Sequence, residues 1–217
     1  MRGVIFDCDG VLLDSTSAWH EAEARVGIAG GIDFTKADVD YLNTCTVDEA
    51  AVWFCSKSDA YETPDEVIAR IDEYMLEFYG NHACALPGAL EFVRALHEAG
   101  VPTAVLSSSP VRYLAAGLAT CGFADCFDAI VSSGDLGLSK RDPEVFARVV
   151  EKLGTDVAET WMVEDSFYSL ATARESGLRT LGIYSNDKSG TKEQLAAHAD
   201  YVFDSLGELG FERFMAL

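Results

Sequence analysis

The sequence predicts an α/β fold: a Rossmann-like, mostly parallel sheet as the core, with an inserted all-helical segment. Two observations predict the sheet. Short apolar runs rich in β-branched residues alternate with amphipathic helical segments, and residues that favour helix starts and ends flank those segments. A third observation predicts the insert, because residues 15–82 hold helical patterns and no convincing strand. We expect residues 1–14 and 83–217 to form the core and residues 15–82 to form a helical cap domain.

Six short apolar runs mark the strands of the predicted sheet. Their length and apolar character are typical of strands that are buried on both faces. They are Val4 to Phe6, Thr103 to Leu106, Ala129 to Val131, Trp161 to Val163, Thr180 to Ile183 and Tyr201 to Phe203. The core helices predicted between them are Gly88 to Ala99, Pro110 to Cys121 after a Ser109 cap, a helix from Asp142 and Pro143 to Gly154, and Phe167 to Ser176.

The insert carries its own helix signals. Thr46-x-x-Glu49 and Thr63-Pro64-x-Glu66 both have the pattern of a capping box. After the second box, apolar residues recur at helical spacing as far as Gly80, which predicts one long amphipathic helix. Residues 15–82 also contain 14 acidic and four basic side chains, so that about a third of the chain carries half of its net charge.

Composition and charge restrict the class of function. The chain has 217 residues, 49% of them hydrophobic, and a formal net charge of −20, so we expect no binding to nucleic acid or to an anionic membrane surface. The longest uncharged runs are shorter than the roughly 18 residues that a membrane span requires. Six cysteines without a CxxC pair and an N-terminus interrupted by aspartates predict a cytoplasmic protein. The oligomeric state is left open.

Polar residues follow three of the predicted strands, at the edge where parallel sheets bind ligands. The first strand is followed by Asp7-Cys8-Asp9-Gly10, the second by Ser107-Ser108-Ser109 and the fourth by Glu164-Asp165-Ser166. Lys140 lies in the loop before the helix that begins at Asp142 and Pro143. We therefore expect four carboxylates, a hydroxyl and an ammonium group to meet at one edge of the sheet.

This set of side chains favours magnesium and phosphoryl chemistry. Converging carboxylates repel one another unless they share a cation, and oxygen donors without paired His or Cys favour Mg²⁺ over zinc. An aspartate can act as a covalent nucleophile towards phosphorus, and a second carboxyl group two residues later is well placed for proton transfer. Asp-x-Asp-Gly also occurs in turns and calcium loops, but Val11 and Leu12 occupy positions where a calcium loop needs a ligand and a glycine.

The combined motifs resemble those of the haloacid dehalogenase superfamily, in the branch with a helical cap after the first strand. The similarity covers the core from end to end. It rests on Phe6-Asp7-Cys8-Asp9-Gly10-Val11-Leu12-Leu13-Asp14-Ser15, Val105-Leu106-Ser107, Lys140 with Pro143, and Val163-Glu164-Asp165-Ser166. The resemblance implies that Asp7 is the nucleophile, that Asp9 is the general acid and base, and that a phospho-aspartate forms.

The resemblance also implies roles for the remaining site residues. Ser107 would hydrogen-bond the phosphoryl group and Lys140 would balance its charge. Asp165, with Glu164 nearby, would hold Mg²⁺ together with Asp7 and the backbone carbonyl of Asp9. Three further residues are assigned to phosphate or substrate binding, namely Gly10, Ser108 and the insert residue Arg70.

The function implied is a Mg²⁺-dependent phosphatase for a small phosphorylated metabolite. Two alternatives stay open. The first is a phosphomutase similar to beta-phosphoglucomutase, but Trp19 and Val47 stand where those enzymes carry a histidine and an arginine. The second is a non-catalytic phospho-acceptor or binding module, similar in layout to a response-regulator receiver. The insert and Asp9 argue against it.

Overall fold

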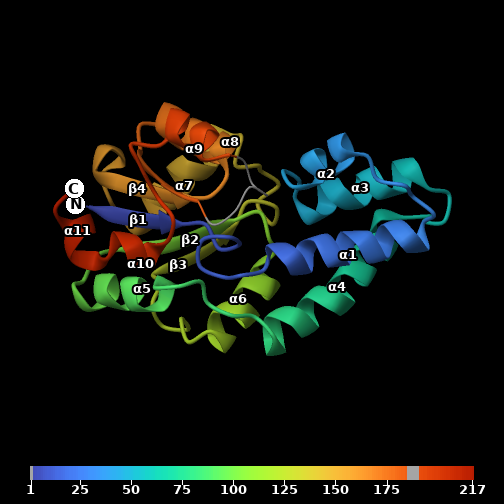
Figure 1. The fold of residues 1–217 in the computed structure, drawn as a ribbon, viewed down its shortest axis with the longest axis horizontal. Coiled ribbons are helices and arrows are strands. Elements are labelled where there is room, and N and C mark those ends of the chain that lie inside the picture. The colour runs from blue at the N-terminus through green and yellow to red at the C-terminus, as the bar shows by residue number, and fades with distance from the viewer. Residues whose placement is uncertain (1, 185–190) are drawn as a thin grey trace.

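The core of the molecule is a six-stranded sheet in which every strand runs parallel to its neighbours (Figure 1). The computed structural model describes residues 2–184 and 191–217. The strands lie in the order β3-β2-β1-β4-β5-β6. Their bounds are β1 Gly3–Phe6, β2 Thr103–Ser107, β3 Ala129–Ser132, β4 Thr160–Glu164, β5 Arg179–Ile183 and β6 Tyr201–Phe203. The predicted fold class and all six predicted strands are confirmed.

The first strand occupies the middle of the sheet, which explains its wholly apolar sequence. Val4 is in register with Thr103 of β2 on one side and with Trp161 of β4 on the other, and all four residues of β1 are buried. The strand order changes direction between β1 and β4. In a doubly wound sheet, the crevice at such a switch point, beyond the carboxyl ends of the strands, is the usual ligand site.

Helices cover both faces of the sheet and bury two apolar layers. Alternate residues of β1 point to opposite faces. Ile5 joins a cluster with Val145 and Phe146 of α7, whereas Val4 and Phe6 join the larger cluster on the other face. The core helices are α5 Ala89–Glu98, α6 Val111–Thr120, α7 Pro143–Leu153, α8 Phe167–Glu175, α9 Lys192–His198, α10 Leu206–Leu209 and α11 Phe211–Met215, with a 3₁₀ turn at Val157–Glu159. Asp142 and the left-handed Gly154 cap α7 as predicted.

Four helices form the segment between β1 and α5, and they extend to one side of the sheet (Figure 1). They are α1 Thr16–Ala29, α2 Lys36–Leu42, α3 Val47–Lys57 and α4 Pro64–Asn81. The predicted periodicity of α4 is confirmed: Val67, Ile71, Met75 and Tyr79 are buried along one face. The helix ends one residue beyond Gly80, at Asn81.

Two predicted helix caps differ in their outcome. The Thr46 hydroxyl accepts a hydrogen bond from the backbone N–H of Glu49, which completes the predicted capping box. The prediction of a box at Thr63 is wrong, because Thr63 makes no side-chain cap. The carboxylate of Glu66 instead accepts a hydrogen bond from the backbone N–H of Glu62 at 2.9 Å. Pro64 has no backbone N–H, so the first position of this helix leaves no donor that needs an acceptor.

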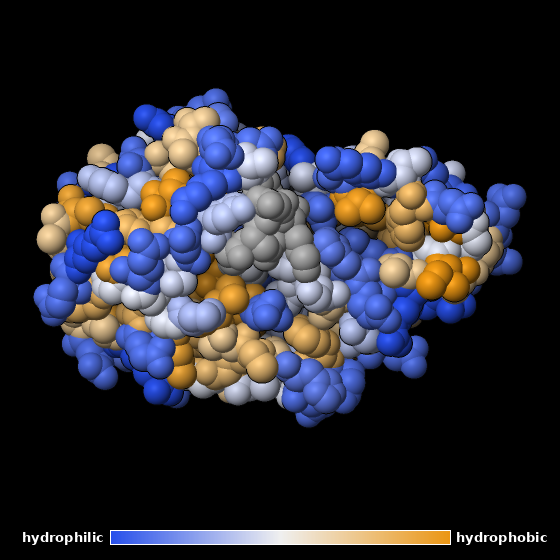
Figure 2. All heavy atoms as spheres, viewed as in Figure 1, coloured by the Kyte–Doolittle hydropathy of each residue, from blue (hydrophilic) through white to orange (hydrophobic). Residues whose placement is uncertain are grey.

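The visible surface is largely hydrophilic, with apolar residues scattered over the core and the insert (Figure 2). Exposed large apolar side chains include Ile28, Tyr41, Val52 and Leu136. Among the helices that the structure describes, none combines the length and the apolar character needed to cross a bilayer.

Candidate active site

The predicted catalytic residues gather at the carboxyl ends of the central strands. Asp7 directly follows β1, where its backbone N–H donates to the carbonyl of Val163 in β4 at 2.9 Å. Ser107 is the last residue of β2 and Glu164 is the last residue of β4. These three side chains are all buried. The sheet therefore places hydroxyl and carboxyl groups in one confined space.

Lys140 joins this group from the loop before α7. Its ammonium group donates to Oδ1 of Asp7 at 2.5 Å and to Oε2 of Glu164 at 2.8 Å, with only 3% of the residue exposed. Burial alone would lower the pKa of Lys140, but the carboxylates of Asp7 and Glu164 outweigh burial and raise it. The lysine is therefore a fixed positive charge within contact of the proposed nucleophile.

The site carries more negative charge than Lys140 can balance. The pKa of the Asp7 carboxyl is raised well above its usual range, first by burial and then by the charge of Glu164, against the opposing effect of Lys140. Burial would also raise the pKa of Glu164, but its contacts with Lys140 lower it overall. A further cation would therefore stabilise this cluster.

Asp7, Glu164 and Asp165 offer ligand atoms that all lie within 4.8 Å of one another. Both oxygens of Glu164 are already engaged, since Oε2 accepts from Lys140 and Oε1 accepts from the backbone N–H groups of Asp165 and Ser166. Asp165 lies against Gly10, where an added Cβ would stand 2.3 Å from its Oδ2 and where φ is +88°. Gly10 thus lets the Asp165 carboxylate approach, and the all-oxygen donor set fits Mg²⁺.

Four hydroxyl groups surround the carboxyl group of Asp9. On Oδ1 it accepts hydrogen bonds from Ser15, at 2.5 Å, and from Tyr79. On Oδ2 it accepts from Ser109 at 2.6 Å and from Ser107 at 3.3 Å. Such a shell fixes the orientation of Asp9 relative to Asp7.

Sequence reasoning missed three of these four donors. The prediction that Ser109 caps the following helix is wrong, because Pro110 is the N-cap residue of α6 and the Ser109 hydroxyl donates to Asp9. In the sequence, Tyr79 belongs to the apolar repeat that predicts the helix ending near Gly80, and Ser15 is the last residue of the first motif. No local pattern distinguishes these hydroxyls, since they reach Asp9 through tertiary packing.

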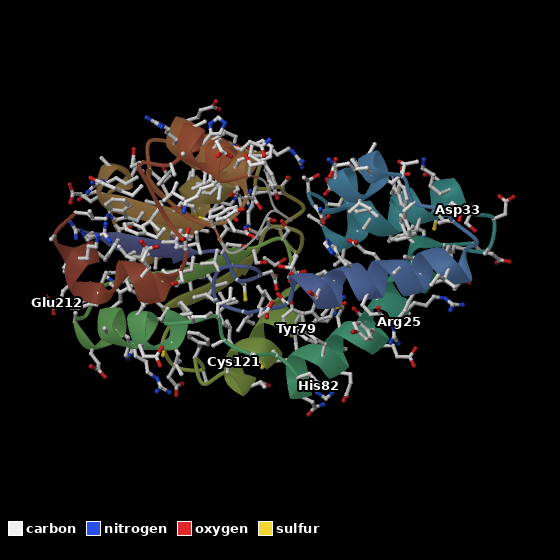
Figure 3. The ribbon with its side chains drawn as sticks, viewed as in Figure 1. Arg25, Asp33, Tyr79, His82, Cys121 and Glu212 are labelled. Atoms are coloured by element: carbon white, nitrogen blue, oxygen red, sulfur yellow. The ribbon has the colours of Figure 1, made fainter. Side chains whose placement is uncertain are left out.

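Tyr79 connects the insert to the catalytic core. It lies where α4 meets the core (Figure 3). Its hydroxyl donates to Asp9 and accepts a hydrogen bond from Nε1 of Trp19 in α1 at 2.9 Å, while its ring stacks on Tyr113 of α6 with centroids 5.6 Å apart. The orientation of Asp9 therefore depends on two helices of the insert.

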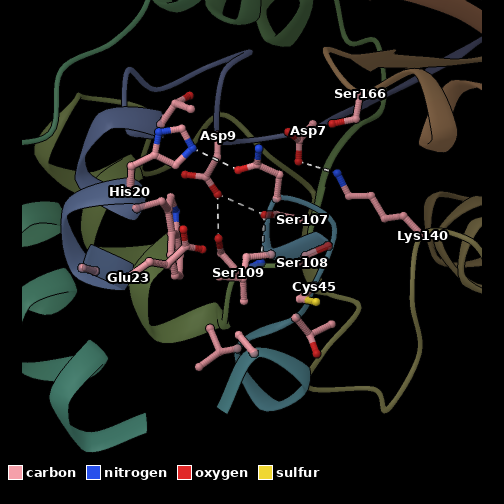
Figure 4. A pocket seen from close by; sticks show the side chains of 18 of the residues that line it. Asp7, Asp9, His20, Glu23, Cys45, Ser107, Ser108, Ser109, Lys140 and Ser166 are labelled. Atoms are coloured by element: carbon pink, nitrogen blue, oxygen red, sulfur yellow. Dashed lines mark hydrogen bonds and ion pairs between the residues drawn. The ribbon is translucent and has the colours of Figure 1, made fainter. Parts of the chain in front are cut away.

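A cavity of about 120 Å³ lies between the core and the insert, next to Asp7 and Asp9. Its core side includes Ser107, Ser108 and Lys140. This space lies directly beside Asp7 and Asp9, so it is the place where a small ligand would bind. Figure 4 shows Asp7 and Lys140 on one side of this space and His20 and Glu23 on the other.

Arg70 is not brought to this cavity. It is exposed on α4, with its guanidinium 5.6 Å from the centre of the Tyr61 ring, and it is absent from the described cavity wall. Arg141, next to Lys140, instead links the core to the insert. Its side chain donates to the carbonyl of Thr44 at 3.1 Å and lies over the ring of Tyr168.

Comparisons with known proteins agree with this architecture. The sequence model of one family, described as haloacid dehalogenase-like hydrolase, matches residues 1–177. The chain is 27% identical to hexitol phosphatase B of Escherichia coli (strain K12) over 207 residues, covering 94% of this chain and 92% of that protein. It is 29% identical to phosphoglycolate phosphatase of Vibrio vulnificus (strain CMCP6) over 217 residues, covering 95% and 93%. The crystal structure of CbbY from Rhodobacter sphaeroides in complex with phosphate has a TM-score of 0.83 at 21% identity, covering 97% and 96%.

A doubly wound parallel sheet with buried carboxyl groups at its switch point defines the broad class, an α/β enzyme that acts at the carboxyl ends of its strands. Within this class, the chain belongs to the haloacid dehalogenase-like hydrolases. The resemblance inferred from the motifs and the predicted enzyme class are confirmed.

Proposed function

We propose that this hydrolase removes phosphate from a small phosphate ester through a phospho-aspartate intermediate on Asp7. The observation that carries this proposal is the position of Asp7, buried at the switch point and in contact with Lys140, with Asp9 held beside the same cavity. The names of the relatives support the same chemistry, since hexitol phosphatase B and phosphoglycolate phosphatase both act on phosphate esters by name. The cytoplasmic location of the protein remains a prediction from the sequence.

The proposed reaction has two steps. First, a carboxylate oxygen of Asp7 attacks phosphorus, the bond from phosphorus to the ester oxygen breaks, and Asp9 gives its proton to the leaving oxygen. Second, Asp9 takes a proton from a water molecule that attacks phosphorus, and the bond between phosphorus and Asp7 breaks to release phosphate. Ser107 and Lys140 would contact the phosphoryl oxygens throughout and balance their charge.

We also propose that Asp7, Asp165 and the backbone carbonyl of Asp9 hold Mg²⁺. When bound, the ion neutralises phosphate charge and aligns the phosphoryl group with Asp7. Glu164 would act next to it by holding Lys140, as its two engaged oxygens support. Gly10 would leave room for the Asp165 carboxylate, because it has no side chain. Ser108 would contribute to phosphate binding at the cavity wall.

We propose that residues 15–82 act as a cap domain over the cavity. Their helices supply the wall opposite Lys140, and such a cover excludes bulk water from a reactive intermediate. A mutase must in addition hold a second phosphate group in this region. Among the described residues of the insert, no lysine or arginine lines the cavity, so a hydrolase is favoured over a mutase.

The test is phosphate release from a panel of small phosphate esters, with Mg²⁺ and with a chelator. We expect turnover in the wild type with Mg²⁺ only, and a loss of at least about 10³-fold in Asp7→Asn. Asp125→Asn is the matched control, because Asp125 is exposed and outside the cavity. Transient accumulation of a bisphosphate would indicate a mutase. A stable phospho-aspartate without turnover would indicate a phospho-acceptor module.

A further inference from the structure

Glu23 is the one carboxyl group that the insert contributes to the described cavity wall. It lies on α1 across the space from Lys140, beside His20 (Figure 4). Among residues 2–184 and 191–217, none donates a hydrogen bond to it or forms an ion pair with it. Loss of hydration alone raises the pKa of Glu23 to about 7. A ligand that donates hydrogen bonds to such a buried carboxyl group would therefore be stabilised by binding there.

The charges around Glu23 restrict which ligand can do so. Lys140 is the one lysine or arginine in the described cavity wall, and it is already paired with Asp7 and Glu164. On the insert side His20 and Asn43 also line the cavity, and Oδ1 of Asn43 lies 3.0 Å from Nε2 of His20. A carboxylate or a second phosphate at this end would face Glu23 without a lysine or arginine of the described cavity wall beside it.

We infer that Glu23 determines specificity, by accepting hydrogen bonds from a monophosphate whose organic part donates hydrogen bonds and carries no negative charge. The inference rests on the proposed function, because it takes the phosphate to lie at Asp7 and Lys140. The organic part of the substrate then extends towards α1. Polyhydroxylated monophosphates meet this requirement, whereas phosphorylated carboxylic acids and bisphosphates do not.

The test compares kcat/KM for matched substrates in the wild type, Glu23→Gln and Glu21→Gln. Glucitol 6-phosphate represents the polyol monophosphates, 2-phosphoglycolate and fructose 1,6-bisphosphate represent the excluded anions, and p-nitrophenyl phosphate reports the chemistry alone. Glu21 is the matched control because it lies on the same helix but is exposed and paired with Arg25. Its replacement removes the same charge outside the cavity.

We expect the wild type to prefer glucitol 6-phosphate to 2-phosphoglycolate by at least about tenfold, and Glu23→Gln to reduce that preference by about tenfold. Glu21→Gln should leave it within about twofold. A wild-type preference for 2-phosphoglycolate or the bisphosphate, or an unchanged preference in Glu23→Gln, would overturn the inference. Comparison of glucosamine 6-phosphate with glucose 6-phosphate then shows whether an ammonium or a hydroxyl group is the better donor to Glu23.

A binding experiment separates this inference from the proposed function. If p-nitrophenyl phosphate is not hydrolysed, the proposed function fails, but calorimetry with glucitol 6-phosphate still tests Glu23. In the Asp7→Asn background, adding Glu23→Gln should weaken this binding by about tenfold and leave the binding of inorganic phosphate within about twofold. If Glu23→Gln weakened the binding of both ligands equally, or weakened the binding of neither, Glu23 would not contact the organic part of the substrate.

Discussion

The two sides of the cavity differ in how their charged groups are held. On the core side, Lys140 contacts two carboxylates and Asp9 accepts hydrogen bonds from four hydroxyls. On the insert side, Glu23 has no such partner among the described residues. Groups that perform chemistry must be fixed before the substrate arrives, whereas groups that recognise a substrate must keep bonding capacity for it. We therefore propose that the core performs the reaction and that the insert selects the substrate.

The largest effect is expected when the charge balance of the core is broken. Lys140→Ala leaves Asp7 and Glu164 buried without their positive partner. In the presence of a chelator, the free energy of unfolding measured with urea should fall by about 3–5 kcal/mol. Phosphate release with Mg²⁺ should fall by at least about 10²-fold.

Lys152→Ala is the control for this variant, because Lys152 is exposed on α7. Its replacement should change stability by less than about 0.5 kcal/mol. Mg²⁺ should recover part of the stability that Lys140→Ala loses, since it supplies positive charge to the same carboxylates. A loss below about 1 kcal/mol in chelator would mean that the cluster does not depend on Lys140.

A smaller effect is expected at the contact between the two sides. Tyr79→Phe keeps the ring that stacks on Tyr113 but removes the hydroxyl that joins Asp9 to Trp19. We expect a loss of about 1 kcal/mol in stability and a decrease of roughly three- to tenfold in kcat, with KM little changed. Steady-state kinetics and urea unfolding measure the two effects.

Tyr74→Phe, on the same helix, is the matched control, because the Tyr74 ring lies under the guanidinium of Arg25 away from the cavity. It should leave kcat unchanged. If Tyr79→Phe instead raised KM alone, Tyr79 would act in substrate binding and not in positioning Asp9.

The smallest effect concerns the pH dependence of stability at Glu23. Its pKa is about 7 in the folded protein and about 4.5 for an ordinary glutamate side chain, so the folded state retains a proton that the unfolded state releases between these values. The contribution of Glu23 to stability is therefore present below about pH 4.5 and is lost as the pH rises through 7. The glutamine side chain of the Glu23→Gln variant does not ionise. The stability of this variant relative to wild type should therefore increase by about 1–2 kcal/mol between pH 5 and pH 8.

Urea unfolding at the two pH values measures this difference, with Glu21→Gln as the control. Glu21 is exposed and paired with Arg25, so its replacement should show no comparable increase. Equal pH profiles for Glu23→Gln and wild type would show that Glu23 keeps an ordinary pKa.

The sequence indicated those site residues that directly follow or end a strand of the sheet. Asp7, Ser107 and Glu164 stand at the ends of apolar strands, and the parallel sheet brings all such ends to one edge. Lys140 lies at the same edge, because the loop before α7 brings its ammonium group to Asp7. The positions of the strands follow from patterns within a few residues, which a single sequence contains.

The parts that were missed depend on contacts between distant segments. Tyr79 is 70 residues from Asp9 and Ser109 is 100 residues from it, and nothing adjacent to either marks a hydrogen bond to a carboxyl group. Glu23 is one of 14 acidic residues in residues 15–82, and only the packing of α1 over the cavity distinguishes it. Arg70 is the opposite case, because the resemblance assigned it to substrate binding and the fold leaves it exposed over Tyr61.

The most direct test of the division between core and insert is one ratio measured in two variants. The ratio is kcat/KM for glucitol 6-phosphate divided by kcat/KM for p-nitrophenyl phosphate. Ser107→Ala should lower both values and keep their ratio within about twofold, whereas Glu23→Gln should lower the ratio by about tenfold. A larger change of the ratio in Ser107→Ala than in Glu23→Gln would contradict the assignment of chemistry to the core and of substrate choice to the insert.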